Sequence, residues 1–300
     1  MRIQSSNPTT LQAAILLSLL MEATARKPGN VHPGAAYADL TYQDFVSSAQ
    51  AIAPILVQAR SVSVGETILS AVTASKKHSA SNSHLGTIFL LAPMAAVPHE
   101  SPLATGLPTI LSQLTRSDAE KVYAAIAVAN PGGMGTVSDN DVSDIPSGTL
   151  LAVMQQAEDR DLVAAQFGNG FQQVLQFGLD HLKSIWKQPD DWETAIISLQ
   201  LAFMANYPDS LIARKCGLPM AEISATKAAE VINLGWPDSP QSQQALQKFD
   251  YWLRADSNRR NPGTTADLIT ACLFAVIRDQ TFHSTFQSEL IQSPTFREFF

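Results

Sequence analysis

The sequence predicts an all-α fold, a single compact multi-helix domain over residues 1–300. Three observations carry this prediction. Apolar residues recur at helical spacing along most of the chain. Strand signals are weak, because no Asn-Gly or Asp-Gly hairpin turn stands between alternating apolar and polar runs. Charged residues make up only 16% of the chain, below the usual share, which indicates that much of the helical surface is buried.

Caps and apolar stripes place the helices of the first half. Residues 11–24 are apolar with scattered polar gaps, and residues 86–97 are almost entirely apolar, so both stretches predict buried helices. Thr41 is a suitable N-cap, and Ser117 followed by Glu120 is typical of a capping box. The expected helices of this half span 11–24, 42–59, 65–77, 86–97 and 117–129, with a proline-rich loop over 98–108.

The same criteria apply to the second half. Residues 170–186 and 192–204 carry helical periodicity on both sides of a short polar break, which favours a helical hairpin. Pro-rich residues 235–240 interrupt the pattern, and we interpret them as a loop rather than as a domain linker. The expected helices span 150–157, 162–167, 170–186, 192–204, 221–234, 241–253 and 265–278, followed by a short C-terminal helix.

Composition and charge exclude several function classes. The net charge is −7 and no stretch concentrates Lys or Arg, so nucleic-acid binding is not expected. Cys216 and Cys272 lie far apart without metal-ligand spacing, which favours free thiols in a reducing compartment. The apolar run 11–21 is short and lacks a basic leader, so we expect neither a signal peptide nor a membrane span, and a cytoplasmic location. The apolar helices leave room for a homodimer interface.

The first polar motif begins with Glu22 and continues through Arg26 to Lys27-Pro28-Gly29-Asn30. An apolar helix ends here, because proline cannot continue it and glycine lets the backbone approach a ligand closely. A carboxylate beside cations suits a site that handles an anion together with a metal. An ordinary helix stop with basic C-terminal residues explains the same pattern equally well.

Two further motifs lie in the middle of the chain. Asn82-Ser83-His84-Leu85-Gly86-Thr87 precedes an apolar helix, where polar side chains and glycine make either a ligand pocket or a plain N-cap. His84 is a candidate for general acid or base, or for a capping residue. A glycine-rich stretch then leads to Asp139, Asp141 and Asp144, whose oxygens suit Mg²⁺ but also fit a solvated acidic loop. The glycine pattern lacks the Gly-Lys-Ser/Thr of a Walker motif.

The last two motifs combine carboxylates with arginines. Asp209 is placed to cap a helix, and Arg214 follows about one turn later, which suits either a metal with a phosphate or a salt-bridged turn. Arg259 is followed by Asn261-Pro262-Gly263-Thr264, and Thr264 with Asp267 is typical of a capping box that opens a buried helix. Arginines beside the free amides of a helix start suit a triphosphate.

Together, and in this order, the motifs resemble those of the triphosphoribosyl-dephospho-CoA synthase family. The resemblance implies an all-α fold and a reaction between ATP and 3′-dephospho-CoA. In that reaction a ribose 2′-hydroxyl attacks C1′ of the ATP ribose, adenine leaves, and the triphosphate stays on the transferred sugar. The matching segments are Glu22 with Lys27–Val31, Asn82–Gly86, Asp209 with Arg214, and Asp256 with Asn261–Asp267.

The resemblance also implies roles for individual side chains and a bound Mg²⁺. Glu22, His84 and Asp267 are then the catalytic candidates, and Asp209, Asp139 and Asp256 are the candidate metal ligands. The substrate-binding candidates are Lys27, Gly29, Asn30, Asn82, Arg214, Lys215, Arg259, Asn261, Gly263 and Thr264.

The chain departs from the family pattern at three places, one of them in the last motif, where Asn261 and Thr264-Thr265 stand in place of Ser and Gly-Ser. Leu85 stands where the family usually has lysine, and the Asp139–Asp144 segment stands where the synthases carry Arg-Gly-Glu. A related hydroxyl acceptor is therefore an alternative to dephospho-CoA. A metal-dependent nucleotide or ribosyl hydrolase and a non-catalytic nucleotide-binding protein are the other readings of the same residues.

Overall fold

The computed structural model describes residues 10–78, 83–130, 146–279 and 284–300. These ranges form helices and no strand, apart from one isolated bridge between His32 and Ala35, so the all-α prediction is confirmed. The helices are α1 Leu11–Thr24, α2 Tyr42–Leu56, α3 Val64–Lys76, α4 Leu85–Ala96, α5 Leu103–Ser112, α6 Arg116–Ala129, α7 Leu150–Gln155 and α8 Leu162–Asn169. They continue with α9 Leu179–Ile185, α10 Trp192–Asn206, α11 Ser210–Cys216, α12 Leu218–Asn233, α13 Pro240–Arg254, α14 Gly263–Arg278 and α15 Ser284–Gln292.

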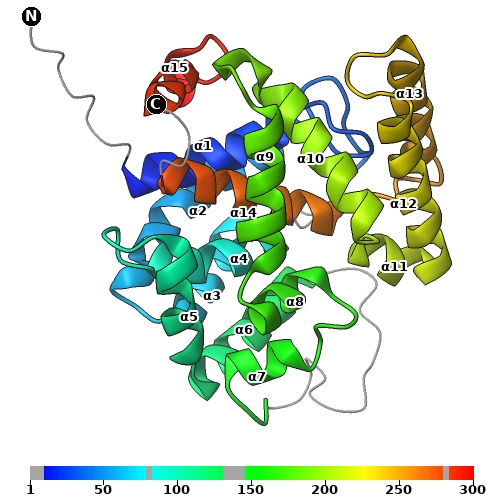
Figure 1. Cartoon of the computed structure of the whole chain (residues 1–300). Helices are drawn as coiled ribbons and strands as arrows, with labels where there is room; N and C mark the ends of the chain where they lie inside the picture. The colour runs from blue at the N-terminus through cyan, green and yellow to red at the C-terminus, as the bar shows by residue number, and fades with distance from the viewer. Residues whose placement is uncertain (1–9, 79–82, 131–145, 280–283) are drawn as a thin grey trace, which may run out of the picture.

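Two apolar helices, α1 and α14, form the centre of the molecule and lie side by side in Figure 1. Both are buried along nearly their whole length, because apolar residues occupy almost every face rather than one stripe. Helices α2 and α4 pack against this pair, and α3 joins α6 on the outer side. The main hydrophobic core therefore surrounds two helices whose few polar residues, Glu22 and Asp267 among them, must find partners inside the protein.

A second, smaller core lies between α10, α11, α12 and α13, on the right in Figure 1. Leu201, Phe249 and Leu253 are buried in it. Helix α10 contacts both α12 and α14, so it connects this core to the central pair. The arrangement holds α11 and the turn before α14 beside the start of α14.

Helix α5 corrects the loop that the sequence predicted over 98–108. The helix begins directly after Pro102, and its buried residues Leu103, Leu107 and Leu111 are four positions apart on one face. The amide of Leu103 donates to Asp279 Oδ2 at 2.8 Å, which satisfies one free donor of the helix start. The prolines concealed this helix, although the apolar spacing of its leucines was already a helical signal.

Local signals elsewhere were partly right. Thr41 caps α2 as predicted. The predicted capping box at Ser117 is wrong, because Thr115 caps α6 together with Asp118, which also accepts from the amide of Gly65 at 2.8 Å. The single helix expected over 170–186 instead contains a π-helical turn, Gln173–Gly178, before α9.

No helix in the described part of the chain is long and apolar enough to cross a lipid bilayer.

Candidate functional site

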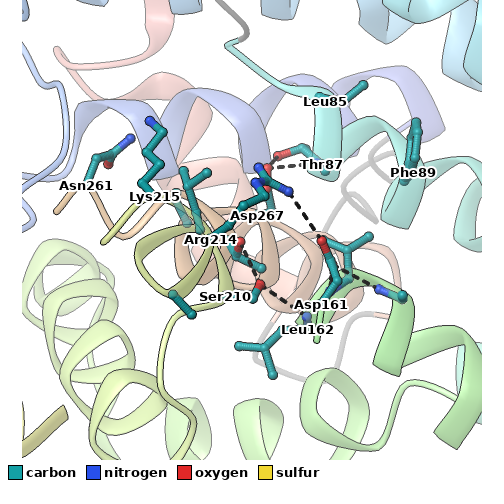
Figure 2. A pocket seen from close by; sticks show the side chains of 18 of the residues that line it. Leu85, Thr87, Phe89, Asp161, Leu162, Ser210, Arg214, Lys215, Asn261 and Asp267 are labelled. Carbon is teal, nitrogen blue, oxygen red and sulfur yellow. Dashed lines mark hydrogen bonds and ion pairs between the residues drawn. The ribbon is translucent and has the colours of Figure 1, made fainter. Parts of the chain in front are cut away.

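A cavity of about 1150 Å³ opens beside the central helices α1 and α14, and residues of α4, α7, α8 and α11 also line it. The first turns of α4, α8, α11 and α14 all contribute residues to its wall. Figure 2 shows how side chains from these helix starts face one another in it. Of the residues singled out from the sequence, the cavity is lined by Glu22, Asn30, Arg214, Lys215, Asn261, Gly263, Thr264 and Asp267.

Glu22 sits near the end of α1 and pairs with Lys27. Lys27 Nζ lies 2.9 Å from Glu22 Oε1, and it also donates to the backbone carbonyl of Glu22. The Lys27 side chain is fully buried and does not line the cavity, whereas Glu22 does. This geometry does not support the prediction that Lys27 holds a phosphate. Lys27 instead fixes Glu22 and neutralises its charge from behind.

The Pro-Gly-Asn turn after Lys27 is held by helices that come much later in the chain. The amide of Gly29 donates to Asp250 Oδ1 at 2.7 Å. Asn30 accepts from Gln200 Nε2 at 2.9 Å and donates to Asn261 Oδ1 at 2.9 Å. Asn30 and Asn261, from two predicted motifs 231 positions apart, thus meet through one amide network at the cavity wall.

Asp267 links α14 to the start of α4. Its Oδ1 accepts from the amide of Thr87 at 2.8 Å and from the Thr87 hydroxyl at 2.6 Å, as Figure 2 shows. The predicted capping box with Thr264 is therefore wrong, because Asp267 caps a different helix from its own. Burial is the main reason that the pKa of Asp267 is raised to about 8, and the charges of Glu22 and Asp209 raise it further against the two Thr87 bonds.

Asp209 joins the starts of α11 and α14. Its Oδ1 accepts from the amides of Leu211 and Ile212 at 2.9 and 3.0 Å, so it caps α11 as predicted. Its Oδ2 accepts from the amide and the hydroxyl of Thr265 at 2.7 and 2.8 Å. These bonds occupy the carboxylate, which is fully buried, so the geometry does not support the prediction that Asp209 is a metal ligand.

Arg214 and Lys215 bring positive charge into the cavity from α11. Arg214 lies 3.7 Å from Asp161, whose other oxygen caps α8 through the amide of Val163 at 2.8 Å. Ser210 binds α8 to α14, because it accepts from the amide of Leu162 at 3.2 Å and donates to Thr264 Oγ1 at 3.1 Å. Figure 2 shows Arg214 paired with Asp161, and Ser210 beside Leu162.

His84 is buried beside the cavity rather than in it. Its Nδ1 lies 2.9 Å from Ser48 Oγ, and Phe45, which does line the cavity, packs edge-on against its ring. Burial lowers the pKa of His84 to about 3, so the ring is neutral at physiological pH. The geometry therefore does not support the prediction that His84 donates a proton to a leaving group.

The remaining predicted residues lie away from the cavity or outside the described part of the chain. Asp256 and Arg259 are exposed, 3.8 Å apart, and neither lines the cavity, so the geometry supports neither a metal role for the first nor a phosphate role for the second. Gly29 lies behind the wall, with a positive φ of 77°. Asn82 and Asp139 lie outside the described residues.

Residues 8–286 match the model of the family described as ATP:dephospho-CoA triphosphoribosyl transferase. The chain belongs to this family. A crystal structure from Archaeoglobus fulgidus, assigned to triphosphoribosyl-dephospho-CoA synthase, has a similar fold with a TM-score of 0.61 and 21% sequence identity, covering 78% of this chain and 98% of that chain. No curated protein matches the chain.

Family membership confirms the resemblance that the motifs indicated. The protein is a triphosphoribosyl transferase of the family whose substrates are ATP and dephospho-CoA, and the hydrolase and binding-protein alternatives are not favoured.

The sequence did not single out several residues that shape this transferase cavity. Asp161 and Ser210 organise its cationic side, and Thr87 holds Asp267. Asp161 stands immediately before a predicted helix, which is an N-cap signal that could have marked it. Gln200 could not be singled out from the sequence, because no local pattern indicates the partner of a glutamine inside an apolar helix.

Gly86 determines whether Asp267 can keep its position in the transferase. A Cβ at Gly86 would lie 2.2 Å from Asp267 Oδ2 and 2.7 Å from its Cγ. We expect Gly86→Ala to push the carboxylate away from Thr87 and to lower kcat about 10²-fold, the cost of misplacing a reacting group by about 1 Å. Steady-state kinetics of adenine release measures this. Gly34→Ala is the control, because its Cβ would meet only the His32 ring at 3.3 Å; equal losses in both variants would contradict the assignment.

The raised pKa of Asp267 also makes a prediction for stability. Its folded-state pKa of about 8 exceeds the ordinary value of 3.8, so the native state favours the protonated form. This contribution to stability is fully present below about pH 4 and is lost as the pH rises through about 8. We expect the Tm of the substrate-free wild type to fall relative to that of Asp267→Asn between pH 6 and pH 8.5, measured by calorimetry. A difference in Tm that does not change with pH would contradict the raised pKa.

Proposed function

We propose that this cavity is where the triphosphoribosyl group passes from ATP to a ribose hydroxyl of dephospho-CoA. The observation that carries the proposal is the meeting, in one cavity, of a carboxyl group with a near-neutral pKa and a cationic pair from another helix. The volume of about 1150 Å³ is above the usual range of roughly 300–1,000 Å³ for a single small ligand, as two nucleotide substrates require.

Asp267 is suited to act as the general base. In the reaction a new bond forms between the acceptor oxygen and C1′ of the ATP ribose, while the bond from C1′ to adenine breaks. The acceptor loses its hydroxyl proton, and the departing adenine gains one. A carboxylate whose pKa lies near the working pH accepts a proton efficiently, and Asp267 meets that condition.

The cationic side of the cavity is suited to the triphosphate. Arg214 is held only loosely by Asp161, at 3.7 Å, so it can exchange this partner for phosphate oxygens. Lys215 lines the cavity one residue further along α11. Thr264, in the first turn of α14, adds a hydroxyl where the positive end of the helix dipole favours an anion.

Mg²⁺ fits this residue set only together with the substrate. No group of three or more His, Cys, Asp or Glu side chains in the described ranges is arranged to hold a metal by itself. Mg²⁺ typically binds through one or two carboxylates plus substrate phosphates, and Glu22 and Asp267 both line the cavity. We propose that Glu22 holds Mg²⁺ with the ATP phosphates, which leaves Asp267 free to accept the proton. The cavity wall carries four cationic residues but six carboxylates, so its own side chains do not neutralise the phosphate charge. The ion would supply the missing positive charge.

One experiment separates the possible activities. The protein is incubated with ATP, Mg²⁺ and dephospho-CoA, and adenine and the triphosphoribosyl product are followed by mass spectrometry. We expect equal amounts of adenine and coupled product, and no product after chelation of Mg²⁺ with EDTA. Adenine without coupled product would indicate a hydrolase. Heat stabilisation by ATP without any turnover would indicate a binding protein and would contradict the proposal.

A further inference from the structure

The turn between α13 and α14 has an uncommon backbone. Asp256, Ser257 and Asn258 have φ angles of 62°, 53° and 59°, so three consecutive residues with a Cβ adopt the left-handed conformation. This conformation brings Cβ too close to the following carbonyl, and residues other than glycine normally adopt it singly. Asn and Asp tolerate it best, whereas serine is less suited to it.

The surrounding structure holds this turn in place from several sides. The amide of Asn258 donates to the carbonyl of Arg254 at 3.2 Å, and the amide of Arg259 donates to the carbonyl of Asp256 at 3.1 Å. Arg259 Nη2 donates to the carbonyl of Lys215 at 2.7 Å, which joins the turn to the end of α11. These are backbone and arginine contacts, and none of them uses the side chain of Ser257 or Asn258. Glycine at either position would keep every one of them.

Ser257 and Asn258 belong to the wall of the cavity. Both line it, together with Lys215 and Asn261, whereas Asp256 does not. Figure 2 draws Asn261 and Lys215 on the same side of the view. Ser257 and Asn258 form no side-chain hydrogen bond within the described part of the chain. The turn therefore presents a hydroxyl and an amide, both hydrogen-bond donors, beside a cavity-lining cation.

We propose that Ser257 and Asn258 are substrate-binding residues that hydrogen-bond to the triphosphate of ATP beside Lys215. The inference rests on the proposed function of the cavity. Strained backbone persists where the surroundings enforce it, and it concentrates at ligand sites. Here the contacts that enforce the turn do not involve the side chains of Ser257 and Asn258. The hydroxyl and amide groups therefore remain available to a ligand in the cavity. Phosphate oxygens accept hydrogen bonds from hydroxyl and amide groups, and Lys215 adds the charge.

Two substitutions at one position separate strain from ligand contact. Ser257→Ala removes the hydroxyl and keeps the strained conformation, whereas Ser257→Gly removes the hydroxyl and relieves the strain. We expect the glycine variant to melt about 2 °C above the alanine variant without substrate. At Gln244, an exposed helical position in α13, the order should reverse, because glycine disfavours a helix.

Kinetics and binding then test the contact. We expect both Ser257 variants to raise KM for ATP about tenfold, the loss of one hydrogen bond to a charged group, with little change in kcat or in KM for dephospho-CoA. Asn258→Gly should act in the same way. Thermal stabilisation by inorganic tripolyphosphate with Mg²⁺ should weaken in parallel, and this readout does not need turnover.

The outcomes are distinguishable from those of the proposed function. An unchanged KM for ATP and unchanged tripolyphosphate stabilisation in a wild type that does transfer the group would overturn this inference alone. Absence of transfer in the wild type, with tripolyphosphate binding that depends on Ser257, would overturn the proposed function and leave the phosphate contact standing. A glycine variant that melts no higher than the alanine variant would overturn the argument from strain.

Discussion

Asp267→Asn is expected to lower kcat for triphosphoribosyl transfer by about 10²–10⁴-fold, the usual contribution of a general base. Asparagine has nearly the shape of the protonated carboxyl group, and its Oδ1 can still accept from the amide and hydroxyl of Thr87. It cannot accept a proton from the acceptor hydroxyl. The loss should therefore fall on kcat rather than on folding, and stopped assays of adenine release with a parallel melting curve measure both.

The pH profile of this variant tests the same assignment independently. A general base works in its deprotonated form, so wild-type kcat/KM should rise with pH toward the pKa of Asp267, which is about 8 in the absence of a bound cation. Asp267→Asn should lack this limb. Asp161→Asn is a matched control, because Asp161 also lines the cavity but contacts Arg214, so its loss should change KM for ATP and leave the pH limb intact. A wild-type limb that persists in Asp267→Asn would assign the base to another group.

The helices were largely predictable because their signals are local. The boundaries expected for the first helix, residues 11–24, are those of α1, since a threonine cap and a run of apolar residues define it without outside help. Helix α5 was missed because Pro102 and Pro108 are the strongest local signals there, and they outweigh the helical spacing of its three leucines.

Several predicted site residues lie at one cavity, although the structure does not support every role that was predicted for them. Glu22, Asn261 and Asp267 come from distant motifs and line one cavity. Their partners, however, are tertiary. Asp267 binds Thr87, 180 positions away, although the sequence offered Thr264 as a nearer partner. Asp209 likewise accepts a hydrogen bond from Thr265, 56 positions away. A sequence shows which side chains need partners, but only the fold determines which partner each one meets.

At Lys27, the difference between the predicted partner and the partner found in the fold has the largest consequence. We expect Lys27→Met to lower the free energy of unfolding by about 3–5 kcal/mol, because it leaves the carboxylate of Glu22 buried without its cation. In the same experiment the motif-based prediction, in which Lys27 holds a phosphate, requires a raised KM for ATP and a nearly unchanged Tm. Lys215→Met is the matched control, because Lys215 lines the cavity and Lys27 does not.

A double-mutant cycle identifies the cause of the Lys27 effect. If the cost comes from the uncompensated charge of Glu22, then the double variant Glu22→Gln with Lys27→Met should be less destabilised than Lys27→Met alone. Its destabilisation should also be smaller than the sum of the two single effects, by about 0.5–3 kcal/mol. Urea denaturation of the four proteins measures it. Lys215→Met should show the opposite pattern, with a raised KM for ATP and a stability close to that of the wild type. A stable Lys27→Met protein with weakened ATP binding would return Lys27 to the substrate site.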